Sequence, residues 1–154
     1  MRMSSIYYEG MFETRNYIIP DKALYKKHIE QKDKFWTKLR EFLGSLDVVC
    51  SEIILNHHVY KKGELVVLAL MDGENIIKVG LIDAIVVKES KVYLVTRRFT
   101  ASRREIGYYE TEKAETESTF TDAETLVDKK PLIMRGTVSK FHFVLHHHLS
   151  FNNS

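Results

Sequence analysis

Three consecutive runs of strand-forming residues, separated by two short turns, constrain the fold of this chain more than any other feature. Residues 64–71 form a nearly continuous apolar run, which is typical of a strand covered on both faces. Residues 76–87 alternate with a period of two, and residues 92–99 follow after a turn at 88–91. The turn at 72–75 has the Asp-Gly chemistry of a hairpin. The sequence therefore predicts an antiparallel meander of three strands.

A helical pattern precedes these strands. Asp21 follows Pro20 as a good N-cap, and Gly44 suits the position after the last helical residue. Between them, apolar side chains recur at spacings of three and four, the period of one helix face. We expect an amphipathic helix over residues 21–43, of about six turns, that packs on the domain core or supports a homodimer. The apolar stripe consists of Tyr25, Ile29, Trp36, Leu39 and Leu43.

Shorter elements fill the rest of the chain. A capping box at 121–124 predicts a helix of one or two turns that ends near Val127 and that Pro131 stops. Residues 1–19 are aromatic-rich and fit either a strand or an irregular arm. A loop is expected at 100–105. Further strands are expected at 47–60, 106–109, 132–138 and 140–149.

Together these elements predict a single domain over residues 1–154, with its β-barrel body at 47–149. The expected fold is mostly β (α+β): a small, partly closed antiparallel β-barrel with one long N-terminal amphipathic helix packed on it.

Composition restricts the class of protein. A length of 154 residues suits one domain, and 44% hydrophobic with 29% charged residues excludes global disorder. Cys50 is the only cysteine, so no disulfide forms within the chain and a reducing compartment is the simpler interpretation. No apolar run approaches the roughly 20 residues of a membrane-spanning helix, and residues 1–10 lack a signal-peptide core. We expect an intracellular protein, nuclear or cytoplasmic, without membrane association.

The net charge of +2 indicates no partner, but the charges are unevenly distributed. Residues 88–104 are strongly basic, and four arginines surround an aromatic residue where the third strand is expected to end. Arginine forks and hydroxyl groups fit phosphate oxygens, and an aromatic ring stacks on a base. A tyrosine pair follows, of which alternation lets only one point outward. The candidate binding residues are Arg97, Arg98, Phe99, Arg103, Arg104, Tyr108 and Tyr109.

The competing interpretation of this basic stretch is mutual neutralisation, because residues 110–124 are as strongly acidic as residues 88–104 are basic. Asp83 is a separate case. It lies inside an apolar strand, on the predicted face of Leu81 and Ile85, where a carboxylate has to be paired or neutralised. An ion pair with Arg97 in the adjacent strand is its expected role, ahead of a catalytic one.

Histidines near the end of the chain are candidate metal ligands. Alternation places His142, His146 and His148 on one face of a strand, and imidazoles at such spacing can converge on zinc, with His57 or His58 as a further ligand. No cysteine cluster or HExxH motif accompanies them, so we expect no metal and no cofactor. Nucleotide-binding and hydrolase motifs are absent from the sequence, and Cys50 fits a packing residue better than a nucleophile.

Two segments carry a resemblance to known modules. Tyr60-Lys61-Lys62-Gly63-Glu64-Leu65-Val66-Val67, with the two strands after it, resembles the opening of a bromo-adjacent homology domain or a related SH3-like barrel. Leu126-Val127-Asp128-Lys129-Lys130-Pro131-Leu132, followed by Leu145 and His147, resembles a C-terminal β module of mobile-element-derived animal proteins. The resemblance implies a recognition module that acts on chromatin or nucleic acid.

The sequence thus favours a non-enzymatic interaction module that binds nucleic acid or an acidic protein partner through a basic loop. Two alternatives stay open: a small metal-dependent enzyme built on the histidine cluster, and a homo-oligomeric structural protein.

Overall fold

The structure is a computed structural model that describes residues 17–23, 47–137 and 140–145, apart from the side chains of residues 113–117. The described part is mostly β, as predicted. It contains two short 3-10 helices, η2 (Asp21–Ala23) and η3 (Ala123–Thr125). Its strands are β2 (Tyr17–Ile18), β3 (Val48–Cys50), β4 (Glu52–Leu55), β5 (His58–Lys61), β6 (Glu64–Asp72), β7 (Ile76–Lys88), β8 (Lys91–Glu105), β9 (Tyr108–Asp122), β10 (Asp128–Ile133), β11 (Arg135–Thr137) and β12 (Lys140–Val144).

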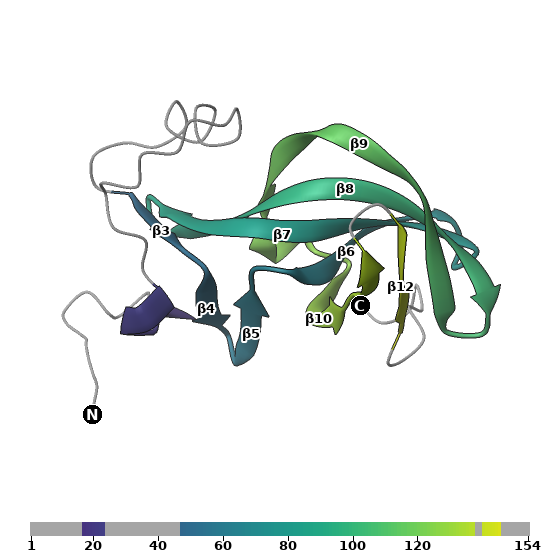
Figure 1. Ribbon diagram of the computed structural model, residues 1–154. Helices are drawn as coiled ribbons and strands as arrows, with labels where there is room; N and C mark the ends of the chain where they lie inside the picture. Colours follow the sequence, from purple (N-terminus) through teal and green to yellow (C-terminus); the bar gives the residue numbers. More distant parts are fainter. Residues whose placement is uncertain (1–16, 24–46, 138–139, 146–154) are drawn as a thin grey trace.

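A curled antiparallel sheet forms the body of the molecule (Figure 1). Its strands run in the order β10-β6-β7-β8-β9-β12-β11, and β3 pairs with β7. The predicted meander of β6, β7 and β8 is confirmed, with hairpin turns at the expected positions. A second sheet, with the order β2-β4-β5, is three-stranded.

The two edges of the large sheet meet at one residue. Edge strand β10 ends at Ile133 and edge strand β11 begins at Arg135, so only Met134 separates them along the chain. A sheet whose opposite edges are joined so closely has to roll up on itself, because consecutive Cα atoms are only about 3.8 Å apart. The result is a half-barrel, the coarse form of the partly closed barrel that the sequence predicts.

Apolar side chains inside the curl form one of the two main core clusters. Its members come from β6, β7, β8, β9, β10 and β12, with Leu145 beyond the end of β12. The rings of Phe99 and Phe141 meet edge to face with centroids 4.7 Å apart, and Tyr109 stacks on Phe143 at 5.4 Å. Such aromatic pairs stabilise a core beyond the area that they bury. The side of the sheet that faces this cluster is called the inner face below.

A second cluster covers the opposite side of the sheet at one end. Ile53, Leu55 and Tyr60 from the three-stranded sheet pack there against Ile82 and Ile85 of β7. The predicted single apolar face of residues 76–87 is therefore wrong. Ile77, Val79 and Leu81 face the inner cluster, whereas Ile85 and Val87 face the second cluster. The pairing register with β8 shifts between Ile82 and Ala84, because Asp83 is an extra residue in a β-bulge. After the bulge, the odd-numbered side chains of β7 point to the side of the sheet opposite to that of Ile77, Val79 and Leu81.

The predicted strand at 47–60 is also wrong, because the structure divides it into β3, β4 and β5. A two-residue turn at Asn56 and His57 joins β4 to β5, and both residues have positive φ, 51° and 71°. This backbone conformation is that of a type I′ hairpin turn, which Asn favours. His57 is exposed in the turn, and His58 lies at the start of β5.

The predicted loop at 100–105 is replaced by strand. β8 continues to Glu105, and a turn at Ile106 and Gly107 leads directly into β9, which runs to Asp122. The short strand expected at 106–109 is thus the start of a long one. The acidic segment at 110–124 lies mostly in β9, which pairs with the basic segment in β8 along nearly its whole length.

The short helix after the capping box is confirmed as η3, although Asp122 rather than Thr121 is its N-cap, with its carboxylate accepting from the Glu124 N–H at 2.9 Å. Pro131 lies within β10 instead of before a strand, which is possible because β10 is an edge strand.

Of the range in which the long helix is expected, only residues 21–23 are described, and they form the 3-10 turn η2; the rest of 21–43 lies outside the described residues, as do residues 1–16 and 146–149 of the predicted arm and last strand. In the described part of the chain, no helix is long and apolar enough to cross a membrane.

Candidate functional site

The strand β8 distributes the predicted basic site over two opposite faces of the sheet. Successive side chains of a strand point to opposite sides. Phe99 and Ala101 face the core, so Arg97 shares their inner side, while Arg98, Thr100 and Ser102 point outward. The residues that the sequence grouped into one loop surface therefore do not form a single surface.

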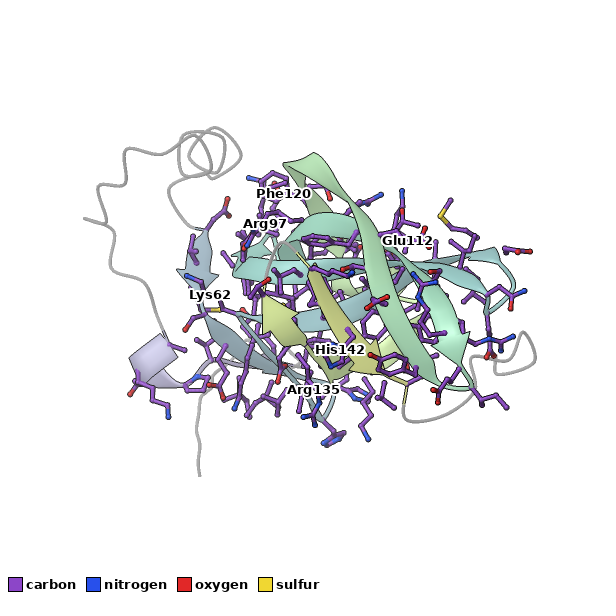
Figure 2. The ribbon with its side chains drawn as sticks, turned by 45° about the vertical axis from the view of Figure 1, so that its right-hand side comes forward. Lys62, Arg97, Glu112, Phe120, Arg135 and His142 are labelled. Carbon is purple, nitrogen blue, oxygen red and sulfur yellow. The ribbon has the colours of Figure 1, made fainter. Side chains whose placement is uncertain are left out.

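Arg97 lies in an ion pair with Asp83, as the sequence predicts. Its Nε and Nη2 donate to the two carboxylate oxygens, each at 2.9 Å. Arg97 pairs in register with Leu81, so the ion pair lies between the inner cluster and a small apolar group of Ala84, Val86 and Val95. Figure 2 shows Arg97 beside Phe120 at this end of the sheet. The Asp83 side chain is only 18% exposed, so this arginine is committed to a structural role.

Phe99 and Tyr109 are core residues. Phe99 is 3% exposed and Tyr109 is fully buried. The Tyr109 hydroxyl donates to the backbone carbonyl of Glu74 in the β6–β7 turn, and burial raises the pKa of this phenol above its ordinary value. Their expected place on the contact surface is therefore incorrect, because the curl of the sheet encloses both rings. The prediction that only one residue of the tyrosine pair points outward holds, and Tyr108 is that residue.

Arg103 is exposed at the end of β8, where it binds the β6–β7 turn. Its Nη2 donates to the Asn75 side-chain oxygen at 2.7 Å, and its backbone N–H donates to the Asn75 carbonyl at 2.8 Å. Arg103 pairs with Tyr109 and belongs to the inner side of the sheet. It is thus separated from the outward-pointing arginines by the thickness of the sheet.

The solvent side of β8, β9, β12 and β11 carries mostly polar side chains among the described residues and is here called the outer face. The strand register shows which residues are neighbours on this face. Ser102 lies opposite Glu110, Glu110 lies opposite His142, and His142 lies opposite Arg135. Figure 2 shows Arg135 and His142 beside each other and Glu112 on β9. The outer face carries Arg98, Thr100, Ser102, Arg104, Tyr108, Glu110, Glu112, Arg135, Thr137, Lys140, His142 and the exposed apolar residue Val144.

Some of the charges on the outer face neutralise one another. Arg104 Nε lies 3.0 Å from Glu110 Oε1, and Ser102 donates to Glu112. A second ion pair between the two segments, Lys91 with Asp122 at 3.6 Å, lies at the far end of the hairpin. The predicted neutralisation of the basic segment by the acidic one is therefore realised in part, between paired strands rather than between loops.

Three cations of the outer face have no such pair among the described side chains. Arg98 donates from Nε to the Thr119 hydroxyl at 3.0 Å, and it stands opposite Gly80, which has no side chain to crowd it. Arg135 and Lys140 are exposed on β11 and β12. No carboxylate of a described side chain lies within ion-pair distance of these three residues.

Sequence reasoning missed Arg135 and Lys140, although a signal for them exists. The chain carries no aspartate or glutamate from Lys129 to Ser154. Within this acid-free segment, alternation around buried Phe141 and Phe143 predicts that Lys140 and His142 point away from the core. The hairpin partner β11 then adds Arg135 to the same side.

A ring pair occupies the middle of the outer face. Tyr108 and His142 are diagonal neighbours on β9 and β12, since Tyr108 pairs with Val144 and His142 with Glu110. Their ring centroids lie 5.5 Å apart with planes tilted by 44°, and both residues are half-buried. The histidine singled out as a metal candidate thus lies against a tyrosine ring.

The catalytic and metal candidates that the sequence suggested do not come together among the described residues. No group of three His, Cys, Asp or Glu side chains there could hold a metal ion, and His146 and His148 lie outside the described residues. Ser102 and His142 are separated by β9, so no nucleophile–base contact exists between them. Cys50 is fully buried, and desolvation raises the pKa of its thiol to about 12, which fits a packing residue.

Comparisons of the chain with models of known protein families, with curated proteins and with solved structures found no match. The resemblance to bromo-adjacent homology domains and to the mobile-element module stays a prediction.

Proposed function

We propose that this protein is a non-enzymatic module that binds nucleic acid through its outer face. The observation that supports the proposal is that three outward-pointing cations, Arg98, Arg135 and Lys140, form no ion pair with a described carboxylate. Thr100 and Thr137 add hydroxyl groups on the same side. Guanidinium, ammonium and hydroxyl donors are the groups that contact phosphate oxygens in protein–nucleic acid complexes.

The proposal moves the binding surface away from the loop that the sequence suggested. Arg97 is held by Asp83 and Arg103 by Asn75, both on the inner side of the sheet. Arg98 and Arg104 stay in the surface, and Arg135 and Lys140 join it from strands that are more than 30 residues further along the chain. Binding is proposed to occur on a strand surface, where the sheet holds the donors at fixed spacing.

Fluorescence anisotropy with labelled single- and double-stranded DNA and RNA oligonucleotides, at about 50 and about 200 mM salt, tests the proposal. We expect affinity to fall with salt, because each neutralised phosphate releases counterions. Replacing Arg98, Arg135 and Lys140 together with glutamine is expected to weaken binding and to flatten the salt dependence. The matched control replaces three cations that are exposed but lie off the outer face, Lys22, Lys62 and Arg103, with glutamine, and it is expected to bind as wild type does.

Two results would overturn the proposal. One is the absence of binding to every oligonucleotide at the lower salt concentration. The other is equal loss of affinity in the triple variant and in the control, since this outcome would mean that net charge alone drives binding. Binding to poly-glutamate but to no oligonucleotide would instead identify an acidic protein as the partner.

A further inference from the structure

We infer that the Tyr108–His142 ring pair is a stacking platform for unpaired bases, so that the outer face selects single-stranded over duplex nucleic acid. This inference rests on the proposed function. It concerns the class of nucleic acid, and the phosphate contacts proposed above carry no such information.

The first support is the position of the rings. Tyr108 and His142 stand on adjacent strands and point away from the core, with centroids 5.5 Å apart. Each ring is half-buried, so part of its surface stays open to solvent. Two side chains on a sheet surface that lean against each other are restrained, and a restrained aromatic surface loses little conformational entropy when a base stacks on it.

The second support is what surrounds the rings. Along the row of paired residues, Glu110 lies on one side of His142 and Arg135 on the other. The Glu110 carboxylate is paired with Arg104 at 3.0 Å, so its charge is neutralised, while Arg135 lies beside His142 without an ion pair to a described side chain. A cation therefore lies next to the ring pair, where a phosphate adjacent to a stacked base would lie.

The third support is the way in which the two classes of nucleic acid present their bases. The rings lie on the outer side of strands β9 and β12, next to the turn at Ile106 and Gly107. Duplex bases are stacked on each other and offer only their edges, so this surface cannot reach their faces. Single strands offer unstacked bases, and an aromatic ring holds each by about 1–3 kcal/mol.

The test compares one labelled single-stranded oligonucleotide with an abasic oligonucleotide of the same length, so that both carry the same number of phosphates. Wild-type protein is expected to bind the base-containing strand about tenfold more tightly than the abasic strand. Tyr108→Leu and His142→Leu should abolish this difference by weakening the binding of the base-containing strand. Tyr108→Phe should retain it, because phenylalanine keeps the ring and the fold.

His58→Leu is the matched control, since His58 is also half-buried beside a tyrosine ring, with the centroid of Tyr60 at 6.5 Å, but on the other sheet. It should leave the preference for the base-containing strand intact. Equal, salt-dependent binding of both strands by wild-type protein would overturn the stacking inference while leaving the proposed function standing. Absence of binding to either strand would overturn the stacking inference, and if a duplex of the same sequence also failed to bind, the proposed function would be overturned as well.

Discussion

Replacing Gly80 with alanine tests how tightly β7 and β8 pack at the centre of the sheet. Gly80 is buried, and a Cβ added there would lie 2.9 Å from Thr96 Cβ, 3.0 Å from its Cγ2 and 3.1 Å from its Oγ1. Carbon atoms pack best at about 3.5–4.0 Å, so the new methyl overlaps a fully buried side chain. The nearest atom is the Cβ of Thr96, which moves only with its backbone.

Overpacking of this kind costs about 1–3 kcal/mol of unfolding free energy. Alanine also restricts the unfolded chain more than glycine does, which contributes about 0.4–1 kcal/mol in the opposite direction. The clash is the larger effect, so we expect Gly80→Ala to destabilise the protein. For a domain of this size, each kcal/mol lowers Tm by about 2–4 °C.

Urea unfolding followed by far-UV circular dichroism measures the effect. In the double variant Gly80→Ala with Thr96→Gly, the threonine side chain that the new methyl would overlap is absent. Its loss of unfolding free energy should therefore be smaller, by at least about 1 kcal/mol, than the sum of the losses in the two single variants. A Gly80→Ala protein with the urea midpoint of wild type, or a double variant with additive losses, would refute the steric reasoning.

Two further predictions concern stability. In a double-mutant cycle on Asp83→Asn and Arg97→Gln, we expect a coupling energy of about 1–3 kcal/mol, because the pair is bidentate and partly shielded from water; additive effects would show that the pair contributes nothing. Burial raises the pKa of Tyr60 from 10.0 to about 12 and that of Cys50 from 9.0 to about 12. Between the ordinary and the raised values, both groups are deprotonated in the unfolded chain but still protonated in the folded protein. The free energy of unfolding should therefore fall as pH rises toward 12. Urea midpoints measured across this range should fall less steeply in Tyr60→Phe with Cys50→Ala, and an unchanged slope would contradict the assignment.

The candidate site shows where sequence reasoning reached its limit. Alternation correctly separated Tyr108 from Tyr109, and the apolar surroundings of Asp83 correctly predicted its pairing with Arg97. The arginines of β8 were wrongly combined into one loop, because a Thr- and Ser-containing stretch between arginines resembles a solvated loop. β9 then provides the polar partner strand that keeps residues 100–105 extended.

The sequence by itself determined the meander of β6, β7 and β8, because a period of two and turn-forming residues are local properties that any strand pairing has to obey. That Arg97 and Arg98 lie on opposite faces follows from β8 continuing as a strand through this stretch, where the sequence predicted one loop surface. Only the tertiary structure decided which of those faces is buried, since alternation is symmetric until the sheet curls one way. The bulge at Asp83 and the junction of both sheet edges at Met134 set that curl, and they depend on strand pairs far apart along the chain. For the same reason Arg135 and His142 joined Tyr108 on one surface only once β12 had paired with β9.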